Sequence, residues 1–185
     1  MKEIKVVLKG NGQGLLMNSP HGMMEEPQAK KKKVKYDPKE EAEKVAYRNK
    51  KGQLIVPSRC IKACILNASS WYKFGRKSAK QIIAGNTRID PVDPVLRDSK
   101  GKVLKKYEID LRPVVVNRSR IIRARPLIEN WELHFTIIYN DNIIGNTELI
   151  EEILIEAGQR IGILDFRPQK YGDCGMFTVK TFKLK

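Results

Sequence analysis

The segment from Trp131 to Tyr139 constrains the fold most, because large apolar side chains alternate strictly with other residues along it. Such a period of two predicts a β-strand. Leu133, Phe135 and Ile137 fall on one face of that strand and His134 on the other. The alternation indicates that the aromatic stripe is a buried face rather than a base-stacking platform. No nucleophile or metal partner accompanies His134, so we expect it to be structural or solvated.

The segment 52–75 predicts a short apolar strand followed by a helix. Leu54, Ile55 and Val56 form the strand, and Ser58 is suited to cap the helix because its hydroxyl can accept from a free backbone N–H. One helical face is apolar and predicted to pack on a core: Ile61, Ile65, Ala68 and Tyr72. The outward side is cationic, with Arg59, Lys62, Lys73, Arg76 and Lys77.

Three further elements complete the pattern. Residues 3–9 alternate as a strand, a helix with a wide apolar stripe follows Asn146 or Thr147, and residues 176–184 form a last strand. The order is strand, helix, strand, strand, helix, strand with insertions, which is the split βαβ arrangement. We therefore predict an α+β, ferredoxin-like (RRM-like) antiparallel sheet with helices on one face, as a single domain over 1–185.

The formal net charge is +15, from 36 Lys and Arg against 21 Asp and Glu. A basic surface of this size favours a polyanionic partner, and nucleic acid fits better than a membrane because no amphipathic helix has a membrane-type apolar face. Residues 10–52 are predicted to be a large basic insertion after the first strand. Asp37 should cap a helix within it, and an arm that could follow a phosphate backbone carries Lys30, Lys31, Lys32 and Lys33.

The segment 112–125 holds five arginines among β-branched residues, which predicts an extended strand. Arginine binds phosphate in a bidentate manner and stacks on bases. We therefore expect nucleic-acid contact here, the alternative being an edge strand kept soluble by charge. The residues concerned are Arg112, Arg118, Arg120, Arg123 and Arg125.

The segment 158–175 is a loop with four glycines and three cations, Arg160, Arg167 and Lys170. Glycine lets a backbone approach a ligand closely, and its N–H groups can meet phosphate oxygens. The alternative is a long connection closed onto the core by Phe166 and Tyr171.

No cofactor or metal is expected. Cys60, Cys64 and Cys174 form no disulfide framework, and the two histidines stand far apart without a ligand cluster. No signal peptide and no apolar run of about 20 residues is present. We therefore expect an intracellular, cytoplasmic protein without a membrane partner.

The helix at 52–75 also resembles a motif of the RAMP superfamily, the RNA-binding subunits of CRISPR effector complexes. There a strand leads into I-P-(G)-S-S-(L/I)-K-G and a helix, and a glycine-rich loop precedes the last strand. Arg59 departs from that motif by standing where a small or polar residue is usual. The residues that match it in order are Ile55, Pro57, Ser58, Ile61, Lys62, Ala63 and Ile65.

The resemblance implies a ferredoxin-like fold and is greatest to the backbone subunits that polymerise along a nucleic acid, including relatives encoded by viruses or mobile elements. We expect a protein that coats single-stranded RNA or DNA by self-association, with little sequence preference. One alternative is a metal-independent RNA endonuclease with His21 as general base or acid. Another is a structural subunit of a larger ribonucleoprotein complex.

Overall fold

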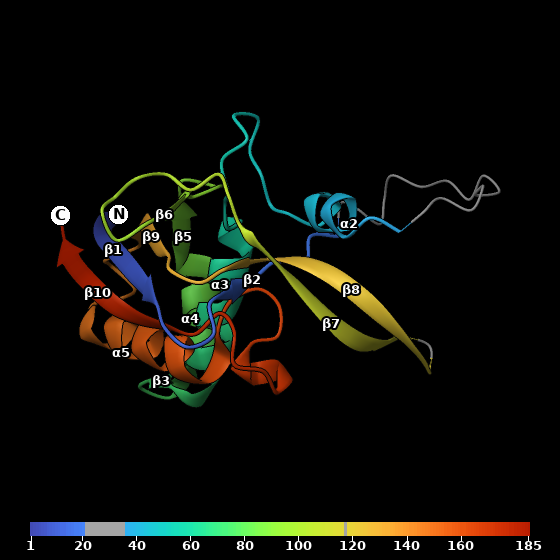
Figure 1. Ribbon diagram of the computed structural model, residues 1–185. Coiled ribbons are helices and arrows are strands. Elements are labelled where there is room, and N and C mark those ends of the chain that lie inside the picture. Colours follow the sequence, from blue (N-terminus) through green and yellow to red (C-terminus); the bar gives the residue numbers. More distant parts are fainter. Residues whose placement is uncertain (21–35, 117) are drawn as a thin grey trace.

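The computed structural model describes residues 1–20, 36–116 and 118–185. Its main sheet is antiparallel, and its strands run in the order β10-β1-β9-β5 (Figure 1). A short strand, β6 (Leu96–Arg97), also pairs with β9. The four strands of the main path are β1 (Lys2–Gly10), β5 (Thr87–Asp90), β9 (Glu132–Tyr139) and β10 (Phe177–Leu184).

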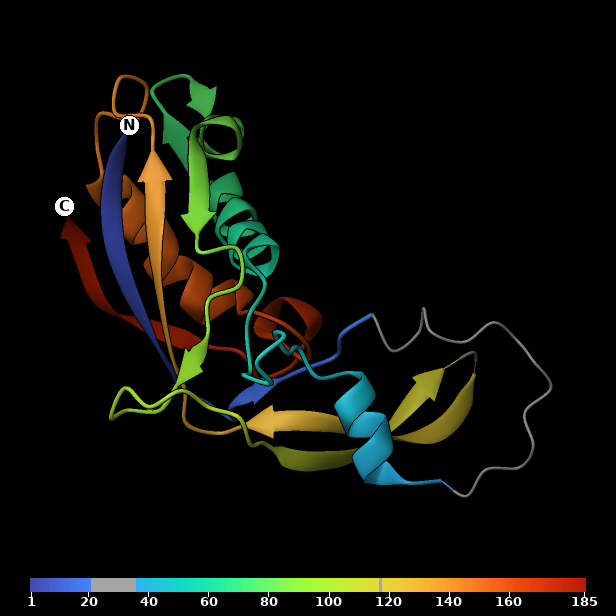
Figure 2. The ribbon, with the colours of Figure 1, turned by 90° about the horizontal axis from the view of Figure 1, so that it is seen from above.

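The core lies between one face of this sheet and the helices α3 (Ser58–Ala68) and α5 (Glu148–Glu156), which lie behind the sheet in Figure 2. A further helix, α4 (Ala79–Asn86), follows α3. Register explains the burial, since the central strands β1 and β9 pair Ile4 with Ile137 and Val6 with Phe135. Because directly paired residues share a face, these side chains form one apolar layer. The alternation predicted for 131–139 is confirmed.

The elements β1, α3, β5, β9, α5 and β10 follow in the ferredoxin-like order, so the predicted fold class is confirmed. The second strand of that order was missed. Residues 88–90 were assigned to no strand from the sequence, where Pro91 and Pro94 follow them, yet they belong to β5 and pair with the central strand β9.

A second sheet projects away from the main sheet (Figure 2), and two of its strands, the hairpin β7–β8, are inserted between β5 and β9. It consists of β2 (Leu15–Leu16), β8 (Ser119–Ile128) and β7 (Glu108–Val116), in the order β2-β8-β7. The prediction of one extended strand over 112–125 is therefore wrong. The chain reverses within it, and Arg118 stands at the turn with a φ of 65°.

The insertion between β1 and α3 contributes β2 and the helix α2 (Pro38–Lys44), which packs on β8. Asp37 caps α2 as predicted, accepting from the Lys39 backbone N–H at 2.9 Å. The boundaries given for this insertion and for the single domain remain predictions. The lysine run at 30–33 and His21 lie outside the described residues.

Helix α3 differs at both ends from the helix predicted in the segment 52–75. Pro57 is the N-cap of α3, with no side-chain cap, so Ser58 is already the first helical residue. The helix ends at Ala68 and continues as a 3₁₀ turn, η1 (Ser69–Trp71), so Tyr72 lies beyond it. A two-stranded hairpin follows, β3 (Lys73–Phe74) with β4 (Lys77–Ser78). Ile61, Ile65 and Ala68 are buried as predicted.

The glycine-rich loop is not loosely ordered. It begins as the π-helical turn η2 (Ala157–Ile161) and contains a 3₁₀ turn, η3 (Pro168–Lys170). A Cβ at Gly175 would lie 1.9 Å from the Ile163 carbonyl oxygen, so this glycine allows two segments of the loop to touch. Tyr171 is fully exposed and does not close the loop onto the core.

Within the described ranges, no helix is both long and apolar enough to span a bilayer. The same residues contain no group of three or more His, Cys, Asp or Glu side chains arranged to hold a metal ion.

Candidate functional site

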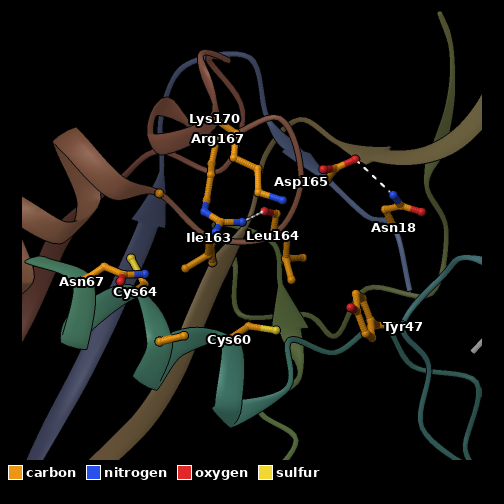
Figure 3. Close-up of a pocket in the computed structure, with 12 residues that line it drawn as sticks. Asn18, Tyr47, Cys60, Cys64, Asn67, Ile163, Leu164, Asp165, Arg167 and Lys170 are labelled. Carbon is orange, nitrogen blue, oxygen red and sulfur yellow. Dashed lines mark hydrogen bonds between the residues drawn. The ribbon is translucent and has the colours of Figure 1, made fainter. Parts of the chain in front are cut away.

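A pocket of about 260 Å³ opens between α3 and the glycine-rich loop (Figure 3). Two stretches that the sequence singled out separately, the helix and the loop, thus form its opposite walls. A third wall comes from the first insertion. The lining residues are Cys60, Ala63, Cys64 and Asn67 from α3, Gly162, Ile163, Leu164, Asp165, Arg167 and Lys170 from the loop, and Asn18 and Tyr47 from the insertion.

The two cysteines that line this pocket are not reactive nucleophiles. The Cys64 thiol contacts the Ala157 carbonyl oxygen at 3.5 Å, and burial raises its pKa to about 12. Burial also raises the pKa of Cys60. Both thiols stay protonated at neutral pH, so neither is an activated nucleophile.

Two cations, Arg167 and Lys170, lie at the rim of the pocket, and a hydrogen bond holds the first of them in place. Arg167 Nη1 donates to the Leu164 carbonyl oxygen at 2.6 Å, which holds the side chain over the loop (Figure 3). Lys170 is exposed, and no ion pair involves it among the described residues. The acid at the rim, Asp165, is occupied by Arg125 at 2.7 Å and by Asn18 at 3.3 Å. The rim therefore offers positive charge to a ligand.

A second hollow of about 550 Å³ lies on the other side of Tyr47, between the end of α2 and the start of α3. Its two arginines differ. Arg48 forms a salt bridge with Glu43 at 2.5 Å and lies 5.3 Å from the Tyr107 ring centroid, whereas Arg59 is exposed and makes no ion pair within the described chain. Tyr47 thus lines both hollows, whereas Arg59 lines only the second.

The arginines of the β7–β8 hairpin lie in very different surroundings. Arg125 is 9% exposed and paired with Asp165, so little of its guanidinium is open to a ligand. Arg123 pairs with Glu41 at 2.7 Å, and Arg112 with Asp110 at 2.7 Å. Arg118 and Arg120 are exposed at the hairpin end, and neither has an ion pair in the part of the chain described.

The cationic side predicted for α3 does not form one surface. Lys62 turns back to the end of α4, where its ammonium donates to the carbonyl oxygens of Ala84, at 2.8 Å, and Thr87. The exposed cations Lys73, Arg76 and Lys77 belong to the β3–β4 hairpin, which follows the C-terminal end of α3. Arg160 stacks on Trp71, next to that hairpin.

The open face of the main sheet has no stacking platform. The face opposite the helices carries Glu132, His134 and Thr136 on β9, and none of its described strand residues is aromatic. Glu132 is buried, and its carboxylate accepts from Lys180 at 2.6 Å and lies 3.5 Å from the His134 ring. Aromatic base stacking of the kind seen in RNA-recognition domains therefore has no residue to perform it on this face.

Of the residues that line the pocket, only Arg167 and Lys170 were predicted as site residues, and the polar side chains Asn18, Tyr47 and Asn67 were assigned no role. Asn18 and Tyr47 stand in irregular segments without a motif, and only the tertiary fold brings them to α3. Asn67 sits on the outward side of the predicted helix, so its position was available although no role was assigned.

Comparison with known proteins gives a likeness of fold. No protein-family model matches the chain, and no curated protein matches it in sequence. Among solved structures, a chain in the cryo-EM structure of the type III-B Cmr-β complex bound to cognate target RNA is similar, with a TM-score of 0.58 and 14% sequence identity. The match covers 99% of this chain and 60% of that chain, so this protein spans less than two thirds of its structural neighbour.

Proposed function

We propose that this protein is a nucleic-acid-binding subunit that coats single-stranded RNA or DNA, with RNA the first candidate. The observation that carries the proposal is the convergence of the α3 motif and the glycine-rich loop on one pocket whose rim includes Arg167 and Lys170, beside Arg59. The structural neighbour belongs to a complex bound to target RNA, which supports RNA as the ligand.

The chemistry of the pocket suits a flexible strand. Exposed cations at its rim can neutralise phosphates, which makes binding strongly salt-dependent. Tyr47, which lies between the two hollows, is 9% exposed, so it offers an edge rather than a free stacking face. The described pocket has no row of side chains that reads base edges, which favours binding with little sequence preference.

Self-association is the second part of the proposal, and the hairpin supports it. On one side of the β7–β8 hairpin, Leu111, Val115 and Ile122 are 53%, 69% and 60% exposed. Their strand register places them on the same face, where they form an apolar strip that ends at Arg120, the residue opposite Val115. Such a strip is costly to leave in water and marks a contact surface. We propose that this strip contacts a neighbouring copy of the protein bound to the same nucleic-acid strand.

The assembly is tested by size-exclusion chromatography with light scattering, with and without a long single-stranded RNA. The variant L111S/V115S should remain folded and bind the RNA, yet lose the higher oligomers that the unchanged protein forms. Leu184→Ser is the control, because Leu184 is 52% exposed on the far edge of the main sheet. Identical oligomers in all three proteins would refute the hairpin contact.

A ribonuclease treatment separates the coating role from a purely structural one. If the basic surface binds RNA, nuclease digestion of the purified protein should remove absorbance at 260 nm together with the oligomers. Oligomers that survive digestion would instead indicate a subunit held by protein contacts alone. The endonuclease alternative remains a prediction, since His21 lies outside the described residues.

A further inference from the structure

Trp71 stands in an unusual position for a tryptophan. It is the last residue of η1, directly after α3, and it is 51% exposed. The Arg160 guanidinium lies over its ring, 4.3 Å from the centroid. A cation on one face of an indole orients the ring, and the exposure of Trp71 leaves much of the remaining surface open to solvent.

The surroundings of Trp71 are strongly cationic. The chain contains no acidic residue from Ser58 to Ile89, although acids make up 21 of its 185 residues. Lys73, Arg76 and Lys77 on the neighbouring β3–β4 hairpin are exposed, and no ion pair involves them in the described ranges. Two acids of α5, Glu152 and Glu156, lie near Tyr72, and Glu156 is 3.4 Å from Arg160. An exposed aromatic ring beside a hairpin with three exposed cations is the combination that binds single-stranded nucleic acid.

The helix α3 connects this cluster with the pocket. Its 11 residues span about 16 Å at about 1.5 Å per residue. Asn67 lines the pocket, and Trp71 follows it by four residues, one turn further on. A nucleic-acid strand that leaves the pocket rim at Lys170 and follows α3 therefore meets Trp71 and Arg160 before it reaches the β3–β4 hairpin.

We propose that Trp71 is a base-stacking residue, held in place by Arg160, at a second contact point for single-stranded nucleic acid at the C-terminal end of α3. This inference rests on the proposed function, because it extends the path of the same strand. Two separated contacts on each subunit provide one place where the strand enters and one where it leaves.

The chain allows a direct optical test, because it contains only two tryptophans. Trp131 is 2% exposed in the core, so a change in intrinsic fluorescence on ligand addition reports mainly on Trp71. Unlabelled oligouridine is titrated into the protein at low salt, while fluorescence anisotropy of a labelled copy of the same oligonucleotide measures binding separately. The expected result is strong quenching that saturates at the concentration where the anisotropy saturates.

Two variants show whether the stack contributes to affinity. Trp71→Ala should weaken single-strand binding by about tenfold, whereas Trp71→Phe retains an aromatic face and should bind nearly as well as the unchanged protein. Leu184→Ala is the matched control, since Leu184 is exposed to the same extent. Circular dichroism confirms that all variants are folded.

The outcomes separate the two proposals. Binding by anisotropy without quenching, or with Trp71→Ala unchanged in affinity, overturns the stacking role and leaves the proposed function intact. Loss of oligomers in Trp71→Ala with unchanged affinity also overturns it, because Trp71 would then contact protein. Absence of any binding by anisotropy overturns the proposed function itself.

Discussion

Arg125 Nη1 lies 2.7 Å from Asp165 Oδ2, which joins the base of the projecting hairpin to the glycine-rich loop. The two residues are 40 positions apart in the chain, and Arg125 is 9% exposed. Asn18 donates to the same carboxylate oxygen at 3.3 Å. Because Asp165 also lines the pocket, one buried ion pair fixes both the direction of the hairpin and the position of the pocket wall.

Breaking this pair should be costly. Arg125→Met leaves Asp165 without its main partner, and we expect a loss of about 3 kcal/mol in the free energy of unfolding, measured by urea denaturation. Arg125 also lies 3.7 Å from Asp110, which keeps its salt bridge to Arg112 at 2.7 Å. The double variant R125M/D165L removes both charges of the Arg125–Asp165 pair and should therefore lose less than the single variant. Glu40→Gln, which removes an exposed partner of Lys44, is the control and should change stability by less than about 0.5 kcal/mol. Equal losses for Arg125→Met and Glu40→Gln would disprove the structural role of the pair.

The cations near the pocket should govern the salt dependence of binding. In the proposed function Arg59 and Lys170 each contact one phosphate, so Arg59→Gln and Lys170→Gln should each weaken RNA binding and reduce the slope of log K against log salt by about 0.7. Lys100→Gln makes the same change in net charge at the turn after β6, where the Gly101 N–H donates to the Asp98 carbonyl oxygen. Its slope should stay unchanged, and an equal effect for all three variants would show that only the overall charge matters.

The sequence predicted the fold better than the site. The strict alternation in 131–139 and the apolar stripe of 149–154 indicate burial directly, so β9 and α5 could be predicted from the sequence. The hairpin was not, because Arg118 turns the chain without a glycine or proline to mark the reversal. The ion pair of Arg125 could not be predicted either. Arg125 has the same kind of sequence neighbours as Arg120, and only the tertiary fold brings Asp165 beside it.

The glycines of the loop offer a test of close packing. Gly175 and Gly101 both have positive φ, of 70° and 82°. A Cβ at Gly175 would meet the Ile163 carbonyl oxygen, whereas a Cβ at Gly101 would meet nothing within 4 Å. Gly101→Ala should therefore lose about 1 kcal/mol of stability from backbone strain alone. Gly175→Ala should lose at least about 2 kcal/mol more because two segments must move apart. Similar losses would indicate that the loop backbone is open, as a phosphate-binding role of its glycines would require.

The buried Glu132 should contribute an acid-sensitive part of the stability. The hydrogen bond from Lys180 lowers the pKa of Glu132 below its ordinary value of 4.5. A carboxylate with a lowered pKa in the folded state stabilises the protein above the pKa of the unfolded chain, and this contribution is lost as pH falls through the folded value. Glu132→Gln should therefore cost about 1–2 kcal/mol near neutral pH, and the difference from the unchanged protein should shrink below about pH 4.5. Urea denaturation at both pH values measures this, and a difference independent of pH would contradict it.

The glycine-rich loop illustrates what residue pattern alone leaves undecided. Its glycines were equally consistent with a ligand cradle and with a long connection. In the structure Gly175 packs against backbone of the same loop, and the cations Arg167 and Lys170 are what face the pocket. Tyr47 adjoins them only because the first insertion folds back onto α3, a contact for which the sequence carries no signal.

The most direct test of the central claim is fluorescence anisotropy with labelled polypyrimidine RNA, the matching single-stranded DNA and a duplex DNA, at about 50 mM and 200 mM salt. The account predicts tight binding to single strands that weakens steeply at the higher salt, with much weaker binding to the duplex, and the better of the two sugars identifies the natural ligand. Equal affinity for single strands and duplex, or binding that salt leaves unchanged, would contradict a strand-coating role.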